Sequence, residues 1–461
     1  MLDHLSDTRN PDAVVITPIA QSGLASALSA QPAALRAWLA GIGFTAEPGT
    51  TALLPGDGGV GAVWLGVAEE PDLWSYAGLP AALPVGSYRL DPAVTGAAAT
   101  RAVLGWALGS YRFTRYCKPT KDLPVLQWPE TVDRPAVERT IAATQRVRDL
   151  VNTPAADLGP AELADAALAL AQPFKAKVKL IVGDELLEAG YPAIHAVGRA
   201  SDRKPRLIDL TWGRKSRPLV TLVGKGVCFD SGGLDIKPSS SMLLMKKDMG
   251  GAAHALAIAG MIMAAGLPVR LRVLIPAVEN VIAGNAFKPM DVLSTRQGLT
   301  VEVGNTDAEG RLILADALAE ACRAQPELLI DFATLTGAAR VALGPEITPF
   351  YSNDDALAAE LAAQGDRHED PLWRMPLWQP YQKFLESKVA DLSSTGTTPF
   401  AGSITAALFL QRFVAPTVPW IHLDLFAWNP TARPGRPEGG EALGLRAVYA
   451  LIESRFAPRG E

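Results

Sequence analysis

The second half of the chain contains short apolar runs that are almost uninterrupted by polar residues. Ala/Leu-rich stretches of helical character, such as AAHALAIAGMIMAAG at 252–266, lie between several of them. Strands that are apolar along their whole length are typical of a mostly parallel sheet covered by helices on both faces. Because ligands bind outside the carboxyl ends of the strands in such sheets, we expect a functional site at that edge. The runs are LIDLTW, LVTLVG, RLRVLIPA, LTVEV, LLIDFATL and WIHLDL, which begin at residues 207, 219, 270, 299, 328 and 420.

The chain before residue 129 has an α/β pattern of its own. At 461 residues the chain is too long for one ordinary core, so we expect two domains. Strand-like and helical runs alternate in this first part, and we find no catalytic constellation there. A stretch with helical periodicity follows and is closed by Pro154. We predict a smaller N-terminal α/β domain over 1–128 with a role in assembly, a linking helix over 129–153, and a larger catalytic domain over 154–461.

Charge and cysteine content exclude several classes of protein. The net charge is −5 and no Lys/Arg-rich block is present, which argues against nucleic acid as the main partner. The three cysteines are far apart and odd in number, which argues for a reducing compartment and against a thiolate zinc site. The first ten residues include acidic side chains and no apolar segment, so we predict no signal peptide and a cytoplasmic location.

One apolar segment, 252–269, is almost long enough to span a bilayer. It is rich in Ala and Gly, contains His254 and ends near Pro268, so its hydrophobicity is modest. We therefore predict a buried helix of the α/β core at this position, and no membrane partner.

Charged residues gather in three loops of the second domain. The stretch VGKGVCFDSGGLDIKPS, at 223–239, follows one of the apolar runs, and MKKDMGG and NTDAEGR lie beside predicted helices. If these loops meet at one sheet edge, four carboxylates crowd together and need compensating charge. Two divalent cations would supply it. The residues concerned are Lys225, Asp230, Lys237, Asp248, Asp307, Glu309 and Arg311.

The residue types favour a site dominated by carboxylates. Oxygen ligands suit Mg²⁺, Mn²⁺ or Zn²⁺, and a bridging carboxylate holds two metals about 3.5–4 Å apart. The five histidines show neither HxxxH nor HxH spacing, so they do not compete for this role.

Simpler interpretations of each motif stay open at this point. NTDAEG is also compatible with an ordinary turn that precedes a helix, because acidic residues are favoured at a helix start. VGKG invites a phosphate-binding interpretation, but neither GxxxxGK[ST] nor a third glycine is present. The position of Lys237 is equally compatible with a side chain that only extends past Pro238 into solvent.

Several blocks resemble one family in the same order. NTDAEGRL, at 305–312, closely resembles the signature of the leucine aminopeptidase (cytosol aminopeptidase) family. VGKGVCFDSGGLDIKPS, MKKDMGGAA, VENVIAGNAFKPMDVL and DFATLTGA resemble its other blocks, as do GSYRFTRYC and RDLVNTPAADLGP upstream. The similarity covers about 104–344 well and both ends less well.

The resemblance implies a metal-dependent peptidase with two divalent metal ions per subunit, Mn²⁺ or Zn²⁺ with Mg²⁺ as a further candidate. Asp230 and Glu309 match the bridging ligands, Lys225 and Asp248 the tighter site, and Asp307 the more exchangeable site. A ligating lysine must be neutral, which two neighbouring dications enforce by lowering its pKa. The metals would lower the pKa of a bridging water and bind the substrate's free α-amino group, which explains exopeptidase behaviour.

The resemblance also implies two catalytic residues outside the ligand set. Lys237 matches the lysine that polarises the scissile carbonyl and stabilises the oxyanion. Arg311 matches the arginine that holds a bicarbonate ion, which acts as general base; a planar guanidinium suits such an anion. Met245, Thr334 and Gly337 match positions lining the pocket for the N-terminal side chain, although Met245 and Thr334 are also compatible with plain packing.

The chain departs from the family pattern after His422. Relatives usually continue HLD with small residues and a TG-containing loop, whereas this chain has LDLFAWNPTARPGRPEGG. Phe426 and Trp428 would reshape the specificity pocket, so the preferred N-terminal residue is left open.

The function expected from the sequence is hydrolysis of the N-terminal residue from peptides with a free amino terminus. The resemblance implies a homohexamer whose active sites face an interior cavity. Two alternatives stay open. A dinuclear phosphoesterase also uses carboxylate-bridged metals, but such enzymes usually recruit histidines. A peptidase homologue with a mainly DNA-binding or regulatory role is opposed by the acidic net charge.

Overall fold

The computed structural model describes residues 4–458, which form two compact units. The first unit contains the chain up to Gln145 together with Thr431–Glu438, and the second contains Arg146–Pro430 and the chain from Gly439 onward. Helix α5 (Arg134–Asn152) carries the chain from the first unit into the second.

The first unit is an α/β domain, as predicted. Its sheet has the order β1-β6-β5-β2-β4-β3, in which only β3 runs antiparallel to its neighbour among the described strands. Trp106 and Tyr88 lie in its core, fully covered by apolar neighbours. The strands are β1 (Leu5–Ser6), β2 (Val14–Ala20), β3 (Thr51–Gly56), β4 (Gly59–Val67), β5 (Ser87–Leu90) and β6 (Val125–Gln127); the helices are η1 (Gln21–Gly23), α1 (Leu24–Ser29), α2 (Ala33–Gly41), η2 (Leu73–Tyr76), α3 (Leu79–Ala82) and α4 (Gly96–Gly109).

A short segment from near the C-terminus completes this unit. The guanidinium of Arg436 lies over the Trp74 ring, 4.1 Å from its centroid. Gly435 has a φ of +71°, and a Cβ there would lie 2.8 Å from the Cβ of Ala77, so the close approach requires glycine.

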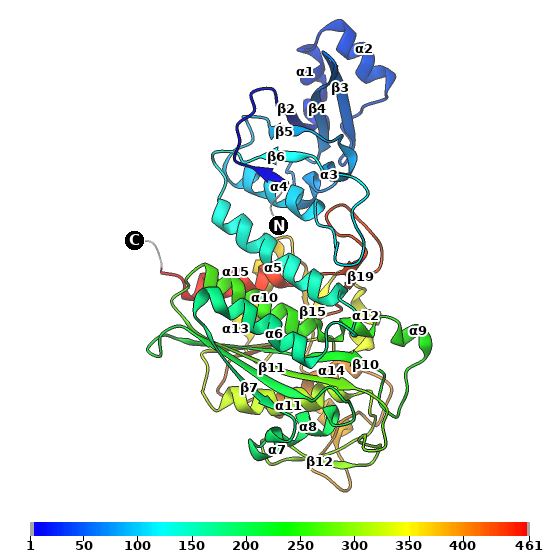
Figure 1. Ribbon diagram of the computed structural model, residues 1–461, viewed down its shortest axis with the longest axis vertical. Coiled ribbons are helices and arrows are strands. Elements are labelled where there is room, and N and C mark those ends of the chain that lie inside the picture. Colours follow the sequence, from blue (N-terminus) through cyan, green and yellow to red (C-terminus); the bar gives the residue numbers. More distant parts are fainter. Residues whose placement is uncertain (1–3, 459–461) are drawn as a thin grey trace. The chain divides into compact units, whose positions relative to one another are not determined.

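The second unit is built on a nine-stranded mixed, mostly parallel sheet (Figure 1). Its order is β16-β15-β18-β14-β9-β11-β8-β7, and β10 pairs with β11 beyond the end of β9. Strands β18, β14, β9 and β11 are mutually parallel, while β7, β8 and β15 supply the antiparallel pairings. The bounds are β7 (Lys177–Val182), β8 (Arg206–Trp212), β9 (Leu219–Gly224), β10 (Gly226–Asp230), β11 (Arg270–Asn280), β14 (Leu328–Ala333), β15 (Thr348–Ser352), β16 (Leu372–Arg374) and β18 (Trp420–Asp424).

Five of the six apolar runs lie in this sheet, and one does not. The run at 299–303 contains β13, which pairs with β12 and β17 in a separate three-stranded sheet. Its placement in the main sheet was wrong, because a short apolar run alone does not specify which neighbour a strand pairs with. The small sheets contain β12 (Val292–Ser294), β13 (Thr300–Glu302) and β17 (Leu392–Ser393), and β19 (Trp428–Asn429) with β20 (Gly439–Gly440).

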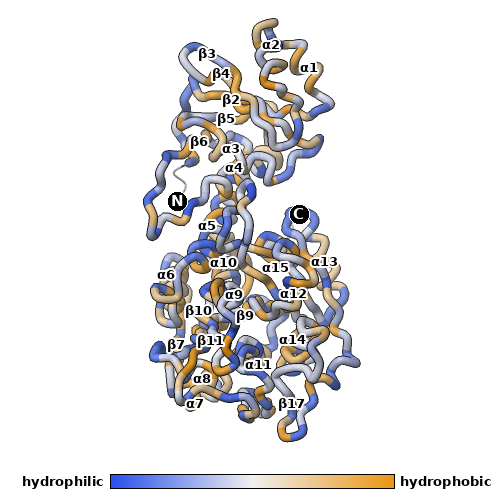
Figure 2. The backbone as a smooth tube through the Cα atoms, turned by 90° about the vertical axis from the view of Figure 1, so that its right-hand side faces the viewer, coloured by the Kyte–Doolittle hydropathy of each residue, from blue (hydrophilic) through white to orange (hydrophobic). Residues whose placement is uncertain are grey.

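Helices cover both faces of the main sheet, as predicted. Helices α6 and α10 pack on one face, and α8 and α11 pack on the other (Figure 1). Apolar stretches recur along the backbone between hydrophilic ones (Figure 2). The helices are α6 (Pro160–Ala171), η3 (Gln172–Phe174), α7 (Glu185–Glu188), α8 (Pro192–Gly198), α9 (Ser239–Met242), η4 (Met245–Met249), α10 (Gly250–Ala264), α11 (Glu309–Cys322), α12 (Gly337–Leu343), α13 (Asp355–Arg367), η5 (Gln379–Leu385), α14 (Gly402–Gln411) and α15 (Leu445–Phe456).

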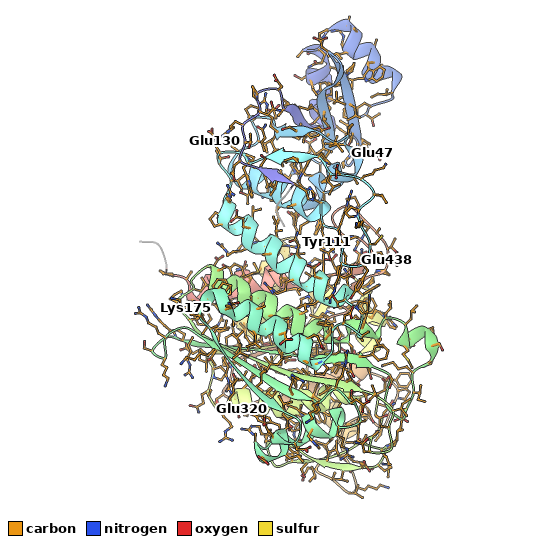
Figure 3. All side chains as sticks on the ribbon, viewed as in Figure 1. Glu47, Tyr111, Glu130, Lys175, Glu320 and Glu438 are labelled. Atoms are coloured by element: carbon orange, nitrogen blue, oxygen red, sulfur yellow. The ribbon has the colours of Figure 1, made fainter. Side chains whose placement is uncertain are left out.

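Ion pairs also fasten α11 to the sheet. The carboxylate of Glu320, labelled in Figure 3, accepts hydrogen bonds from Arg272 of β11 and from Arg296, each at 2.8 Å. Both arginines are largely covered, so these pairs are screened less than surface pairs would be.

Helix α10 is the apolar segment that approaches the length of a membrane span. It is buried on nearly all sides within the second unit, as expected for a helix that is hydrophobic all round. Among the described residues, none of the helices has the length and apolar character needed to cross a bilayer.

The carboxyl ends of β18, β14, β9, β10 and β11 meet at one edge of the sheet. Glycines allow the close approach of the chain there. A Cβ on Gly224 would lie 2.6 Å from the Cα of Ala252, and one on Gly251 would lie 2.1 Å from the carbonyl oxygen of Phe332. The start of α10 is therefore held directly against β9 and β14.

Candidate active site

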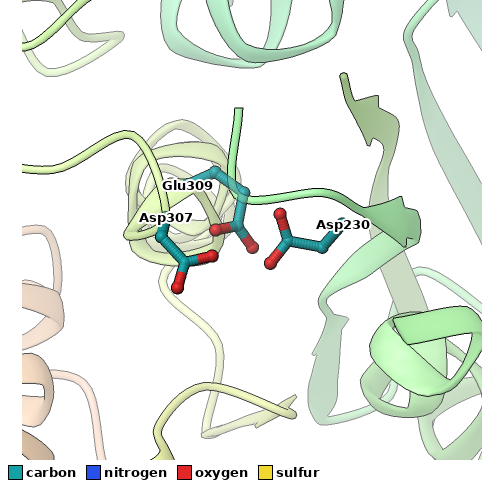
Figure 4. A group of neighbouring side chains, drawn as sticks. All are labelled: Asp230, Asp307 and Glu309. Atoms are coloured by element: carbon teal, nitrogen blue, oxygen red, sulfur yellow. The ribbon is translucent and has the colours of Figure 1, made fainter. Parts of the chain in front are cut away.

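Three carboxylates converge at this edge of the sheet. Asp230 ends β10, Asp307 lies in the loop before α11, and Glu309 is the first residue of α11. Each offers a carboxylate oxygen within 4.8 Å of the other two, and Figure 4 shows the three groups turned toward one another. Asp230 and Glu309 are buried, and Asp307 is one-third exposed. Such a cluster of oxygen atoms suits hard divalent cations.

Lys225 enters the cluster from the end of β9. Its Nζ lies 2.8 Å from Oδ2 of Asp248 and 2.9 Å from Oε1 of Glu309. It also donates to the carbonyl of Thr334 at 3.0 Å. A Cβ on Gly310 would lie 2.8 Å from this Nζ, so glycine at the second position of α11 leaves the space for the lysine.

Asp248 lies at the end of η4, just before α10. Its Oδ1 accepts a hydrogen bond from the hydroxyl of Thr334 at 2.8 Å. Burial acts to raise the pKa of Asp248, but Lys225 and Lys247 outweigh it and lower the pKa. The structure thus brings all five predicted metal ligands into one connected group, with Lys225 joining Asp248 to Glu309.

The buried carboxylates and lysines change one another's acidity. Burial, followed by the charges of Glu309 and Asp248, raises the pKa of Asp230. Burial also raises the pKa of Glu309. Burial lowers the pKa of Lys225, but the surrounding carboxylates outweigh it and raise that pKa overall. The ionised carboxylates of this group therefore destabilise one another unless cations lie nearby.

Lys237 lies on the other side of the cluster. Its Nζ is 2.8 Å from Oδ2 of Asp230 and also contacts Oδ1 of Asp307. Burial lowers the pKa of Lys237, but Asp230 and Glu309 outweigh it and raise the pKa. The Lys237 ammonium therefore lies beside the carboxylates, which favour its charged form, rather than extending into solvent past Pro238.

Asp235, in the loop after β10, holds two loops of the site together. Its Oδ2 accepts a hydrogen bond from the Thr306 backbone N–H at 2.7 Å, and its own backbone N–H donates to the Thr306 hydroxyl oxygen at 2.9 Å. The Thr306 hydroxyl donates to the carbonyl of Gly232 at 2.6 Å. Gly232 and Gly233 have φ values of +89° and +66°, which the tight turn before Asp235 requires.

Arg311 lies in the first turn of α11 and is almost fully covered. Its Nη1 donates to the carbonyl of Ser394 at 2.7 Å, while its Nε is buried without a hydrogen-bond acceptor among the described residues. Burial lowers the pKa of Arg311 to about 10 against the charges of Glu309 and Asp424. The guanidinium therefore stays charged at neutral pH and keeps a donor to offer.

A pocket of about 590 Å³ opens onto this group. Lys225, Asp230, Asp248 and Asp307 line it, whereas Glu309 is buried and is not among the lining residues. Lys237 and Arg311 also line it, as do the predicted specificity residues Met245, Thr334 and Gly337.

Phe426, which the sequence singled out, lines the pocket, whereas Trp428 is not among its described lining residues. Other residues that shape the pocket were missed by sequence analysis. Asp424, at the end of β18, accepts hydrogen bonds from the backbone N–H groups of Leu335 and Thr336, each at 3.0 Å, and so fixes the turn after β14. The sequence signal was its position at the end of a predicted strand. Lys247 and Arg340, which also line the pocket, carried no signal.

Comparison with family models matches most of the chain. Residues 145–449 match the catalytic domain of the cytosol aminopeptidase family, and residues 14–129 match the M17 aminopeptidase N-terminal domain. The chain belongs to the cytosol aminopeptidase family. Membership makes it a metal-dependent aminopeptidase, a hydrolase that acts on peptides. The aminopeptidase interpretation is thereby favoured over the phosphoesterase and DNA-binding alternatives.

Curated relatives and solved structures agree with this membership. A probable cytosol aminopeptidase of Syntrophotalea carbinolica is 42% identical over 79% of this chain and 77% of that protein. A probable cytosol aminopeptidase of Roseiflexus castenholzii is 41% identical over 78% of this chain and 77% of that protein. The crystal structure of a cytosol aminopeptidase from Coxiella burnetii matches with a TM-score of 0.96 and 49% identity, over 98% of this chain and 100% of that one. The structure of the bottromycin maturation enzyme BotP in complex with Mn matches with a TM-score of 0.86 and 35% identity, over 96% of this chain and 99% of that one.

Proposed function

We propose that this aminopeptidase works through two divalent cations held by Lys225, Asp230, Asp248, Asp307 and Glu309, with Asp230 and Glu309 bridging them. The observation that carries the proposal is the convergence of Asp230, Asp307 and Glu309 within 4.8 Å. When bound, the two cations would supply an activated water and a binding point for the free α-amino group of a peptide.

The donor set fits such cations. Oδ2 of Asp248, Oδ1 of Asp307 and Oε1 of Glu309 are buried and receive no hydrogen bond of good geometry. Their ionic partners are the ammonium groups of Lys225 and Lys237. Adding cations would reverse the electrostatic balance at Lys225, because positive neighbours favour the neutral amine that can act as a ligand.

Lys237 would act on the scissile bond. Its ammonium lies at the pocket wall beside Asp230 and Asp307, and the same carboxylates hold it in the charged form. A fixed cation at this place would polarise the carbonyl of the bound peptide and stabilise the negative charge that develops on its oxygen.

Arg311 would hold a bicarbonate ion as general base. The support is its buried Nε, which has no acceptor within the described chain, together with its place in the pocket lining. A planar guanidinium donates in a fixed fork that matches a planar oxyanion.

We further propose Mn²⁺ or Zn²⁺ as the metals, with Mg²⁺ as a third candidate, and a cytoplasmic homohexamer as the working form. The Mn complex of BotP supports manganese. Large exposed apolar side chains of the second unit, among them Trp373, Trp378 and Phe400, support assembly because isolated subunits rarely leave such groups in water. We propose peptides with a free amino terminus as substrates, with neither nucleic acid nor membrane as a partner.

Hydrolysis of aminoacyl p-nitroanilides tests the proposal. The enzyme is stripped with a chelator, and Mn²⁺, Zn²⁺ or Mg²⁺ is added back, with Asp307→Asn in parallel. We expect hydrolysis that requires metal and is lost in the variant. Hydrolysis that persists after complete metal removal would contradict the two-metal site. Turnover of phosphoesters, with none of the anilides, would contradict the aminopeptidase function.

A further inference from the structure

One wall of the pocket carries two cations that face an aromatic ring. The ammonium of Lys247 lies over the ring of Phe426, 5.2 Å from its centroid, and the guanidinium of Arg340 lies over the same ring at 5.0 Å. All three side chains line the pocket. Lys247 is 6% exposed, so a nearly buried ammonium is aimed into the cavity.

These cations lack the carboxylate partners that other basic residues of the site have. Lys225 and Lys237 each lie close to two carboxylates. For Lys247 the nearest carboxylate is that of Asp248, at 3.9 Å, which already contacts Lys225 at 2.8 Å. Within residues 4–458, no carboxylate lies within salt-bridge distance of Arg340. Arg340 is exposed, whereas Lys247 is nearly buried. A buried cation without a close counter-ion is costly, so a ligand carboxylate would relieve that cost at Lys247.

The wall adjoins the positions expected to hold the N-terminal side chain of the substrate. Lys247 follows Met245 by two residues in η4. Arg340 follows Gly337 by three residues in α12, and residues at this spacing lie on the same side of a helix. The hydroxyl of Thr334 bonds Asp248, which precedes the start of α10 and follows Lys247 directly.

We propose that Lys247 and Arg340 select peptides whose N-terminal residue has an acidic side chain, glutamate or aspartate. The proposal rests on the aminopeptidase function of the same pocket. The side-chain carboxylate receives charge-assisted hydrogen bonds from the ammonium and the guanidinium. The ring of Phe426 keeps both cations in place and offers an apolar surface to the methylene groups of the substrate.

The test compares substrates that differ only in charge. We measure kcat/KM of the metal-loaded enzyme for α-linked p-nitroanilides of Glu, Gln, Asp, Asn and Leu. A charge-assisted hydrogen bond in a covered site corresponds to about 10- to 100-fold in affinity. We expect kcat/KM for Glu to exceed that for Gln by at least about tenfold. We also expect kcat/KM for Asp to exceed that for Asn.

Matched variants locate the cause of the selectivity. Lys247→Met and Arg340→Gln should each lower the Glu-to-Gln ratio by about threefold or more, and the double variant should bring it close to one. Lys246→Met is the control, because this neighbouring lysine donates to the carbonyl of Asn152 at 2.7 Å, lies over Trp428 and does not line the pocket. Its ratio should equal that of the wild type.

A second pair of substrates covers the other source of a carboxylate, the C-terminus of a dipeptide. Leu-Gly and Leu-Gly amide should be cleaved with similar kcat/KM if the wall binds the N-terminal side chain. A Glu-to-Gln ratio of one or less with active enzyme overturns the proposal and leaves the aminopeptidase function intact. A preference for Leu-Gly over its amide that disappears in Arg340→Gln would also overturn it. Absence of hydrolysis of every substrate with every metal would contradict the aminopeptidase function itself, and the selectivity with it.

Discussion

Lys225 and Lys237 have opposite expected roles although both contact the same carboxylate cluster. Lys225 enters from β9 and reaches Asp248 and Glu309. Lys237 comes from the loop after β10 and reaches Asp230 and Asp307 at the pocket wall. From this difference in approach we propose that Lys225 belongs to the ligand set and that Lys237 acts on the substrate.

Lys237→Ala tests this division. We expect kcat to fall by about 10²–10³-fold, as is typical when a group that stabilises an oxyanion is removed. The metal content, measured by elemental analysis, should stay near that of the wild type, because the variant keeps all five ligands. An unchanged kcat would reduce Lys237 to a loop residue, and loss of metal together with activity would make it part of the metal site.

At the scale of elements, the loop that ends at Lys237 and the loop that precedes α11 depend on each other. Asp235 of the first loop accepts a hydrogen bond from the N–H of Thr306 and donates one to its hydroxyl oxygen, and Thr306 immediately precedes Asp307 in the second loop. Residues that orient metal ligands typically change metal affinity by 10–100-fold when they are removed.

Asp235→Ala should therefore weaken binding of one metal by about tenfold or more, because the Thr306 N–H loses its acceptor and Asp307 is no longer held. Titration with Mn²⁺ after chelation measures this. Asp235→Asn keeps one acceptor oxygen and should recover part of the affinity. Equal affinity in Asp235→Ala and wild type would show that the loops hold their places without this contact.

His254 fastens α10 to the segment before α15. Its Nε2 accepts the Leu443 N–H at 3.0 Å, and its Nδ1 lies 2.6 Å from the carbonyl of Gly250. Burial lowers the pKa of His254 to about 4, below the ordinary value of 6.5. Above pH 6.5 the residue is neutral in both the folded and the unfolded states. As the pH falls from 6.5 toward 4, only the unfolded state takes up the proton, so folding loses stability.

At pH 5 this loss amounts to about 2 kcal/mol, at 1.36 kcal/mol per pKa unit. We compare the free energy of unfolding at pH 7.5 and pH 5 for the wild type and for His254→Gln. The variant should be less stable at pH 7.5 but should lose about 2 kcal/mol less than the wild type on acidification. The same pH dependence in both proteins would contradict a neutral, buried His254.

For the whole molecule, the sequence predicted the architecture better than it predicted the surroundings of the site. Continuous apolar runs predicted β8, β9, β11, β14 and β18, because a sheet covered on both faces leaves few polar positions within its strands. The run at 299–303 has the same character and yet forms part of a small separate sheet, since pairing is decided by tertiary neighbours.

The convergence of the charged loops could be predicted, because loops that follow neighbouring parallel strands meet at one edge. The contacts of Lys247 and Arg340 with Phe426 could not, since they depend on the directions of side chains from η4, α12 and the turn after β18. The contact between Asp235 and Thr306 could not be predicted either, because the two residues are 71 positions apart in the sequence.

The central claim is that the carboxylates of this one edge hold two metal ions on which peptide hydrolysis depends. Its most direct test is the number of divalent ions bound per chain, measured by elemental analysis in the wild type and in Glu309→Gln, together with hydrolysis of leucine p-nitroanilide. We predict two ions per chain and metal-dependent turnover in the wild type, and loss of both bound metal and turnover in the variant. A variant that retains two ions and the wild-type rate would contradict the assignment of Glu309 as a bridge, and with it the two-metal site.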